Sequence, residues 1–284
     1  TLPSGTADVQ IRRRSPRRSE RAALKTNLQA AYNADGFLID ERKEPTNVLH
    51  RLFDSTLPIR VSRAIGYAAD VPLPQKVLRP IIAAYSAVMG VDMHDVSQPQ
   101  GGFASFGEFF ARRLKSGARP LPTGDDALVS PCDGTLETAF ASNDAGAELR
   151  IKGNDYSVDE LLGGHGESER FAGGGGLVVY LHPRDYHRVH SPCRGELVRV
   201  RHIPGTRYPV AHWSEKRVPL LYQRNERVVF FFELPNRSAL ALTMVAAMGV
   251  GDIASPHAPT PAPRESTTRA LEPRLPFIAG DEVG

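Results

Sequence analysis

The spacing of apolar residues along the chain changes near residue 120, from a helical pattern to a strand pattern. Between residues 47 and 93, apolar side chains recur three or four positions apart, which predicts helices with one buried face. Pro58 and the proline-rich stretch 72–74 divide this region into short helices, because proline lacks the amide that an internal helical hydrogen bond needs. We expect Pro80 to lie in the first turn of a further helix, where that amide has no partner in any case.

A further amphipathic helix is predicted between residues 105 and 121, ending near Gly117. Its apolar side chains would form a buried stripe: Phe106, Phe109, Phe110 and Leu114. Its basic side chains would point to solvent: Arg112, Arg113 and Lys115. A helical layer with an apolar outer face would also suit contact with a membrane surface.

After Pro120 the pattern becomes one of short β-type runs separated by Gly, Pro, Asn and Asp. The runs are GTLETAF, ELRIKG, GLVVYLH, GELVRVRHI, RVVFFFEL and ALALTMVAAM. Short runs joined by turns favour antiparallel pairing. We therefore expect an α+β fold in three parts: a polar, basic and disordered tail (1–46), a helical membrane-facing layer (47–120), and an antiparallel β-rich catalytic core (121–284).

The composition is that of a globular protein with a sizeable core, since 41% of the 284 residues are hydrophobic and 24% are charged. The net charge of +3 is smaller than that expected of a nucleic-acid-binding protein, so we expect no nucleic-acid partner. The two cysteines, Cys132 and Cys193, are expected to be reduced thiols. No apolar run approaches the roughly 20 residues that a membrane-spanning helix needs.

The first 46 residues contain a dense basic cluster, IRRRSPRRSERA. One interpretation is a disordered tail, because the segment is polar and charged. The alternative is an arm attracted to anionic lipid, since each basic residue near such a surface adds about 1 kcal/mol of binding.

The densest group of titratable residues is the stretch YLHPRDYHRVHSPCRGEL, residues 180–197. A metal site, a catalytic site and a polar strand are the three interpretations. A metal site would use His182, His187, His190 and Cys193, but no second Cys/His cluster with zinc spacing accompanies them. Histidine suits general acid-base chemistry near neutral pH, although the chain has no G-x-S-x-G serine motif.

Two local features suggest where turns occur around these residues. Ser191-Pro192 follows the last histidine, so the backbone there is expected to turn instead of running as a plain strand. The rings of His187 and His190 could then reach one pocket from different sides. Asp133 precedes a glycine, and Asp-Gly is a common turn sequence.

Ten motifs along the chain resemble, in order, those of the phosphatidylserine decarboxylase family, which is pyruvoyl-dependent and makes phosphatidylethanolamine. The chain resembles the β chain of that family. The motifs are LPQKVL, VDMHDV, FGEFFARRLKSGARPL, SPCDGTL, KGNDYSVDELLG, YLHPRDYHRVHSPCRGEL, HIPGTRYPV, LLYQRNERVV, VAAMGVGDI and AGDEVG. The most specific signal is DYHRVHSP together with an upstream SP-x-DG and an intervening NDYS.

The resemblance implies that a serine cleaves the precursor into a β chain and a short α chain. In the family, a serine in a Leu-Gly-Ser-Thr context attacks the carbonyl of the preceding glycine, and elimination leaves a pyruvoyl group at the start of the α chain. By motif, Asp133 and His190 match the pair that activates this serine. His187 matches the residue that delivers a proton after CO₂ is lost. Tyr186 and Tyr208 are the further candidates for substrate contact.

The family places its cleavage serine shortly after the AGDEVG motif, so we expect the cut site just beyond Gly284. Three explanations are open: a mature β subunit, a truncated form, or a homologue that does not mature. The chain departs from the family pattern at Asp252, in the segment ASPHAPTPAPRESTT that follows it, and in the run Arg207, Tyr208 and Pro209. The last departure affects the expected identity of the amine substrate more than the type of reaction.

The function implied by the resemblance is decarboxylation of phosphatidylserine to phosphatidylethanolamine, a carboxy-lyase reaction. The covalent pyruvoyl cofactor would form a Schiff base with the substrate amine and accept the electrons released with CO₂. The expected partners are the α chain, a phospholipid membrane surface and further copies of the chain, with a peripheral location on the cytoplasmic side of the cell membrane. No metal is expected. The alternatives are a decarboxylase of a soluble amino acid and a non-catalytic homologue.

Overall fold

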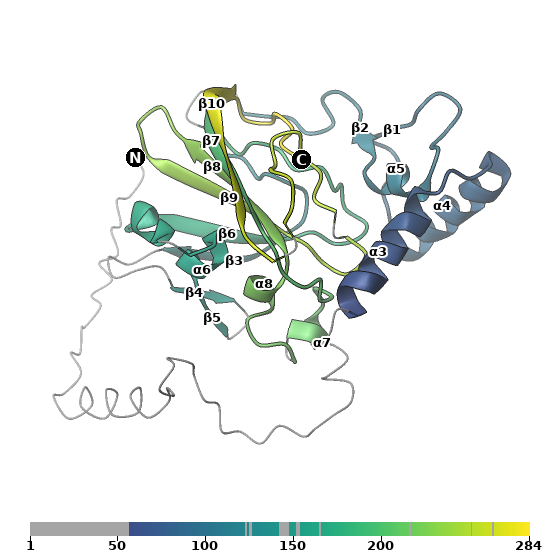
Figure 1. Cartoon of the computed structure of the whole chain (residues 1–284). Helices are drawn as coiled ribbons and strands as arrows, with labels where there is room; N and C mark the ends of the chain where they lie inside the picture. Colours follow the sequence, from purple (N-terminus) through teal and green to yellow (C-terminus); the bar gives the residue numbers. More distant parts are fainter. Residues whose placement is uncertain are drawn as a thin grey trace, which may run out of the picture. The chain divides into compact units, whose positions relative to one another are not determined.

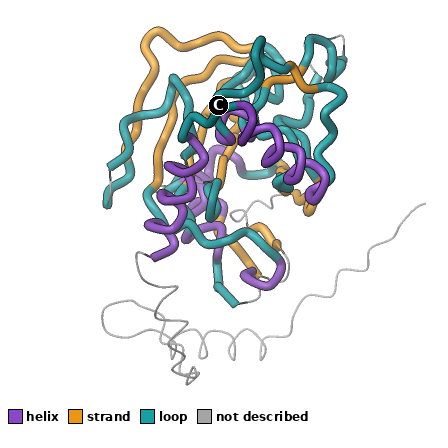
Figure 2. The backbone as a smooth tube through the Cα atoms, turned by 90° about the vertical axis from the view of Figure 1, so that its right-hand side faces the viewer, coloured by secondary structure: helices purple, strands orange, loops and turns teal. Residues whose placement is uncertain are grey.

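A computed structural model describes residues 57–284, apart from 123, 125–126, 142–147, 152–153, 165, 216, 251 and 263. All of these residues belong to one unit of the chain, Leu49–Gly284. The unit combines helices with antiparallel sheets and has a β-rich core, which confirms the predicted α+β class (Figures 1 and 2). The expected basic tail, residues 1–46, lies outside the described residues.

Two helices come first along the described chain, α3 (Leu57–Asp70) and α4 (Gln75–Met89). α4 begins directly after Pro74, whose carbonyl accepts the amide of Leu78 at 3.0 Å. Pro80 therefore lies inside α4 and beyond its first turn, so the expected first-turn position is wrong. In the described parts of the chain, no helix has both the length and the apolar content needed to cross a bilayer.

The segment predicted as a helix over residues 105–121 forms only a short helix, α5 (Phe106–Phe110). Ser105 caps it, because its hydroxyl accepts a first-turn amide at 3.1 Å. The chain then extends, and β2 (Arg113–Leu114) pairs with β1 (Val96–Ser97). The predicted length is wrong because the strand pairing uses backbone groups that a longer helix would have used.

An apolar cluster joins the helices to these short strands: Leu78, Ile82, Val91, Val96, Phe103 and Phe109. Arg113 and Lys115 are exposed, as the sequence predicts. Arg112 is only 3% exposed, so its predicted solvent-facing position is wrong. The cause is the early end of α5, since the extended backbone that follows does not place the side chain on the outer face of a helix.

The main sheet has four antiparallel strands in the order β10–β7–β8–β9: β7 (Gly195–Ile203), β8 (Arg227–Glu233), β9 (Ala239–Val245) and β10 (Thr267–Phe277). β8 is apolar along most of its length, which is typical of a strand buried on both faces. Its alternate residues join two different apolar clusters: Val228, Phe230 and Phe232 in one, and Val229 and Phe231 in the other.

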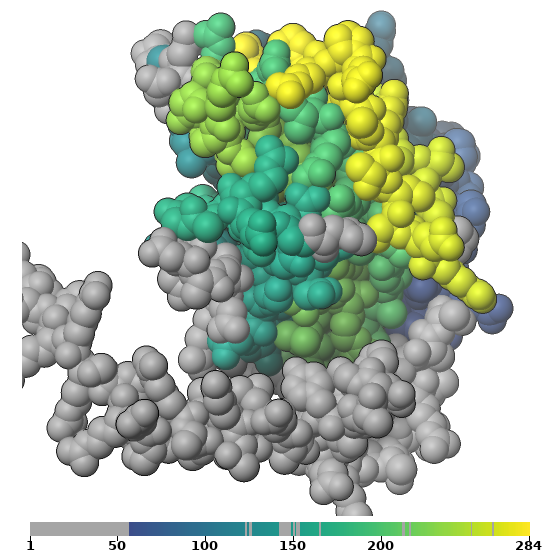
Figure 3. Space-filling view, turned by 60° about the vertical axis from the view of Figure 1, so that its left-hand side comes forward, coloured from purple at the N-terminus to yellow at the C-terminus, as the bar shows by residue number. Residues whose placement is uncertain are grey.

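β10 has no counterpart among the predicted runs, because Pro273 and Pro276 interrupt its pattern. A shift of register between Ala270 and Leu275 accommodates the first of these prolines. The C-terminal part of the chain, yellow in Figure 3, lies alongside the green and teal residues in the space-filling view.

The remaining elements are short. Two further antiparallel pairs occur: β3 (Thr135–Ala141) with β6 (Gly175–Tyr180), and β4 (Glu148–Ile151) with β5 (Asn154–Ser157). The helical elements that follow are α6 (Val158–Leu162), the 3₁₀ helix η1 (Glu167–Phe171), α7 (His212–Glu215) and α8 (Leu221–Arg224).

A buried ion cluster fixes η1 against β7. The carboxylate of Glu167 accepts hydrogen bonds from Arg199 and from Arg201, the latter at 3.0 Å. The guanidinium carbon of Arg199 also lies 4.0 Å from the centre of the Phe231 ring. Because Glu167 is buried, its removal would leave two cations without their carboxylate.

We predict that Glu167→Ala lowers the free energy of unfolding by about 3–5 kcal/mol, the usual cost of breaking a buried ion pair. Chemical denaturation measures this change. The matched control is Glu196→Ala, which removes a half-exposed carboxylate paired with Arg274 and should leave the unfolding midpoint almost unchanged. Equal losses in both variants would contradict the role given to Glu167.

Candidate active site

The histidine segment, residues 181–194, connects β6 to β7 and turns sharply at its start. The amide of Asp185 donates to the carbonyl of His182 at 2.8 Å, and the Asp185 carboxylate accepts the amide of His182 at 2.8 Å. The sequence predicts the turn between His187 and Pro192, but residues 186–189 have no turn. The observed turn lies earlier, at residues 182–185, because the Asp185 side chain stabilises it there. It directs the following residues, Tyr186 to His190, towards the C-terminal end of the chain.

The C-terminal segment, residues 278–284, pairs with the histidine segment through backbone hydrogen bonds. The amide of Val189 donates to the carbonyl of Gly284 at 2.7 Å, and the amide of Val283 donates to the carbonyl of Val189 at 2.9 Å. The amide of Ser191 donates to the carbonyl of Asp281 at 2.7 Å. The backbone of Gly284 therefore lies beside the residue that precedes His190.

Side chains strengthen this pairing at Glu282, which lies opposite His190 in an antiparallel bridge. The Glu282 carboxylate accepts hydrogen bonds from Arg188 and, at 3.3 Å, from Arg113. Arg188 also donates from Nε to the carbonyl of Ala111 at 2.9 Å. The C-terminal segment is thus tied both to the histidine segment and to the chain that follows α5.

Both ring nitrogens of His190 have hydrogen-bond partners. Nδ1 lies 2.8 Å from the carbonyl oxygen of Gly280, and because a carbonyl only accepts, Nδ1 carries the hydrogen. Nε2 lies 3.0 Å from the hydroxyl of Tyr186 and accepts its hydrogen in the neutral ring. Nε2, the nitrogen that can accept, therefore already accepts a hydrogen bond from a hydroxyl group.

His187 lies in a more apolar environment, with its ring centre 4.0 Å from that of Phe110. Its Nδ1 lies 2.9 Å from the carbonyl oxygen of Asp185, so this nitrogen carries the hydrogen and Nε2 has the lone pair. The pKa of His187 is lowered to about 4, mainly by burial, and the nearby positive charge of Arg112 contributes in the same direction. His187 is neutral at physiological pH.

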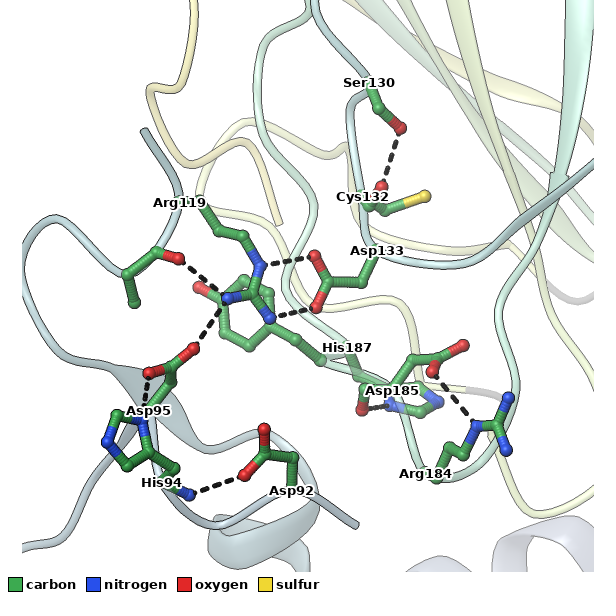
Figure 4. Close-up of polar contacts among 12 residues, drawn as sticks. Asp92, His94, Asp95, Arg119, Ser130, Cys132, Asp133, Arg184, Asp185 and His187 are labelled. Atoms are coloured by element: carbon green, nitrogen blue, oxygen red, sulfur yellow. Dashed lines mark hydrogen bonds and ion pairs between the residues drawn. The ribbon is translucent and has the colours of Figure 1, made fainter. Parts of the chain in front are cut away.

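Asp133 lies at a turn whose backbone packs closely on β6. Gly134, with φ 143°, leaves no room for a side chain, since an added Cβ would lie 2.5 Å from the carbonyl oxygen of Tyr180. Both carboxylate oxygens of Asp133 accept hydrogen bonds from Arg119, at 2.8 Å from Nε and 2.6 Å from Nη2 (Figure 4). Arg119 also reaches Asp95 at 3.1 Å.

The structure therefore brings together some of the predicted residues and not others. Tyr186 contacts His190 directly, whereas the hydrogen bonds of Asp133 go to Arg119 and not to His190. Tyr208 is fully buried in a cluster with Val218 and Leu221. Its hydroxyl accepts a hydrogen bond from Arg224 at 2.9 Å.

Two of the departures from the family pattern, at Arg207 and Asp252, contact each other. Arg207, which is buried, donates from Nη2 to the exposed carboxylate of Asp252 at 3.3 Å and from Nε to Glu226 at 2.9 Å. Glu226 in turn accepts from His202 at 2.9 Å, and the hydrogen bonds from His202 and Arg207 lower its pKa against the opposing effect of burial.

Arg112 and Arg119 are the functional candidates that the sequence pattern does not single out. Both lie in the motif FGEFFARRLKSGARPL, which marks the segment without showing which of its arginines contact the site. Cys132, beside Asp133, is a free thiol whose pKa is raised to about 12, mainly by burial.

Among the described side chains, no group of three or more His, Cys, Asp and Glu comes together as a metal-ligand set.

Comparison with known proteins points to one family. The profile of the family described as phosphatidylserine decarboxylase matches residues 106–284. A phosphatidylserine decarboxylase proenzyme of Brevibacillus brevis is 36% identical over 207 residues, which cover 72% of this chain and 71% of that protein. The proenzymes of Acidovorax ebreus (38% identical, covering 75% and 74%) and Azotobacter vinelandii (39% identical, covering 79% and 80%) are also similar.

The low pKa of His187 predicts acid sensitivity. In the unfolded chain a histidine has a pKa near 6.5, so between pH 6.5 and about 4 the unfolded state binds the proton that the folded state does not. The free energy of unfolding should therefore fall with decreasing pH in this window, by roughly 3 kcal/mol over its full width. Denaturation at several pH values measures the slope.

His187→Gln should flatten this slope, because the side chain no longer titrates. His94→Gln, which changes a histidine with an 85% exposed side chain, is the control and should keep the slope of the unmodified chain. Identical slopes in the unmodified chain and in His187→Gln would refute the assignment.

Proposed function

Because this chain belongs to the phosphatidylserine decarboxylase family, and so is a carboxy-lyase, we propose that it converts phosphatidylserine into phosphatidylethanolamine. The reaction would use a pyruvoyl group made from a serine that follows Gly284 in the precursor. The supporting observation is the backbone pairing of Gly284 with Val189, directly before His190. A chain that continues from Gly284 would start next to Val189, the residue before the histidine proposed to activate its serine.

His190 is the proposed general base for self-cleavage. The serine hydroxyl would give its proton to Nε2 while its oxygen bonds to the carbonyl carbon of the preceding glycine. The peptide C–N bond then breaks and the freed amine takes the proton from His190, which leaves an ester. Loss of the serine α-hydrogen and of the ester oxygen would release the β chain as a carboxylate and leave dehydroalanine at the start of the α chain. Its imine tautomer would take up water and lose ammonia to give the pyruvoyl group. The hydrogen bond from Tyr186 supports this role, because it shows that Nε2 can accept a hydrogen bond from a hydroxyl group. Nδ1 is meanwhile held by the carbonyl of Gly280.

Asp133 is proposed as the carboxylate that stabilises the charged His190 ring. In the structure its oxygens are bound by Arg119. Each carboxylate oxygen has a second lone pair, so a bond to Arg119 leaves acceptor capacity on the same atom. The role requires the side chain to turn one oxygen towards the ring.

His187 is proposed to supply the proton that replaces CO₂ on the substrate. The pyruvoyl group, when present, would accept the electron pair released as CO₂ leaves. The residues fit such a group, since His190 accepts a hydrogen bond from a hydroxyl and the C-terminal segment pairs with the backbone next to it. His187 is neutral before substrate arrives, and the negative carboxylate of the substrate would favour its protonation at Nε2. The Nε2–H then gives its proton to the α-carbon.

A membrane location is proposed from the outer surfaces of α3 and α4. Large apolar side chains there are exposed: Leu57, Val61, Ile65, Tyr67, Val71, Val77, Ile81 and Val88. The first three are four residues apart and so form one stripe on α3. Exposed basic residues accompany them: Arg60, Arg63, Lys76 and Arg79. Apolar and basic residues together suit the cytoplasmic, anionic surface of the cell membrane, where phosphatidylserine is found.

The proposed chemistry predicts different defects for the two histidines in a precursor that includes the segment after Gly284. His190→Ala should remain largely uncleaved, because the serine loses its base. His187→Ala should cleave and carry the pyruvoyl group but decarboxylate phosphatidylserine about 10²–10⁴-fold more slowly. Mass spectrometry and product formation on the same samples measure both effects.

His94→Ala serves as the control in both assays, since it removes a highly exposed histidine ring. Complete cleavage of His190→Ala, or full turnover by His187→Ala, would contradict the assigned role of that residue. A parent precursor that stays one chain would instead indicate a non-catalytic homologue.

The membrane proposal predicts that Val77→Ser with Ile81→Ser weakens co-sedimentation with phosphatidylserine vesicles by at least about tenfold, because two apolar side chains no longer enter the lipid. The matched control is Leu136→Ser with Leu177→Ser, which changes exposed apolar residues on β3 and β6. Equal binding by both double variants would refute the surface assignment. Decarboxylation of free serine without vesicles would support a soluble substrate.

A further inference from the structure

Arg112 is a buried cation without a carboxylate partner in the described part of the chain. It lies in the chain between α5 and β2, and the residue is 3% exposed. Nε and Nη1 are buried with no hydrogen-bond acceptor among the described atoms. Only Nη2 is bound, and its acceptors are backbone carbonyls. Because burying a charge is costly, such an arginine needs an explanation.

The two carbonyls belong to the turn that carries His187. Nη2 of Arg112 donates to the carbonyl of Arg184 at 2.7 Å and to that of Asp185 at 2.9 Å. The Asp185 oxygen also accepts the hydrogen on Nδ1 of His187 at 2.9 Å. One carbonyl oxygen therefore connects the guanidinium to the imidazole, and a shift of Arg112 would move the acceptor that orients the ring.

The helical layer holds the same turn from a second point. The hydroxyl of Tyr85, on α4, donates to the carbonyl of Pro183 at 2.9 Å. The Phe110 ring lies against that of His187. The backbone from Pro183 to Asp185 is thus fixed by side chains of other elements, and Arg112 is the charged one among them.

Charge gives Arg112 a second effect on His187. The groups whose charges act on this ring are Arg112, Asp185 and His182. Asp185 opposes the effect of Arg112, whereas His182 acts in the same direction as Arg112. A cation close to an imidazole disfavours its protonation, and a medium of low polarity strengthens this effect.

We propose that Arg112 is a positioning residue for His187. It fixes the proton of the neutral ring on Nδ1 and so makes Nε2 the nitrogen that takes up and delivers the proton of the reaction. The geometric part is the shared carbonyl of Asp185, and the electrostatic part is the unpaired positive charge. The use of Nε2 in decarboxylation rests on the proposed function. The orientation and the protonation state of the His187 ring are independent of the proposed function.

Nitrogen NMR of the chain with labelled histidine tests the inference directly, with His187→Gln to assign the signal. We expect His187 to be neutral at pH 6 with its proton on Nδ1. In Arg112→Met the pKa of His187 should rise by about one pH unit, because the cation is gone. In Arg112→Lys, which keeps a cation with several donors, it should stay within about 0.3 of the parent value.

The matched control is Arg274→Met, which removes an exposed arginine of β10 paired with Glu196 and Glu233. It should leave the His187 titration unchanged. A proton on Nε2 in the parent chain, or a His187 pKa that is unchanged in folded Arg112→Met, would overturn the proposal. If Arg112→Met does not fold, the test uses the tautomer of His187 in the parent chain and the titration of His187 in Arg112→Lys. A His187 pKa near 6.5 in folded Arg112→Lys would then overturn the proposal.

Activity separates positioning from general stability in a precursor that includes the cleavage segment. Arg112→Met should self-cleave at close to the parent rate, because His190 is held by Gly280 and Tyr186 instead. It should decarboxylate about 10²-fold more slowly, since small displacements of a reacting group have effects of that size. Equal loss of both steps would overturn the proposal. A parent precursor without decarboxylase activity would refute the proposed function and leave the titration result standing.

Discussion

Backbone hydrogen bonds between residues 189–191 and 280–284 set the geometry on which the candidate site depends. They use amides and carbonyls, so they align the two segments independently of side-chain identity. They also bring the carbonyl of Gly280 to Nδ1 of His190, which fixes the orientation of that ring. Glu282 adds a charged contact to Arg188 and Arg113 on the outside of the pairing. A single-residue change of register would turn Glu282 away from its arginines.

Local periodicity predicts the strands well where packing agrees with it. The run GELVRVRHI coincides with β7, and the apolar run RVVFFFEL contains β8. Both are strands whose own residues form much of the core. β10 is different, because its prolines obscure the pattern and its existence depends on pairing with β7. Pairing over long sequence distances also explains why α5 ends early, since β2 is formed by contact with β1.

The candidate site could be located from the sequence, but its contacts could not. The motif DYHRVHSP identifies the segment that carries His187 and His190. The groups that accept the Nδ1 hydrogens of these two rings, the carbonyls of Gly280 and Asp185, belong to the backbone, and no side-chain pattern predicts a backbone acceptor. Buried arginines also bind backbone carbonyls at other places in the fold. Arg227 donates to the carbonyls of Leu161 and Glu160 at 3.0 and 2.7 Å, so this fold repeatedly uses guanidinium groups to hold backbone.

The thiol beside Asp133 has a consequence for the redox behaviour of the site. Burial raises the pKa of the Cys132 thiol to about 12, so the thiol form predominates at neutral pH. Thiolate is the form that oxidants and alkylating reagents attack. Cys193, the other free cysteine, is buried, and burial raises the pKa of its thiol as well. A cysteine can therefore stand next to a candidate catalytic carboxylate and still be a poor target for oxidants and alkylating reagents.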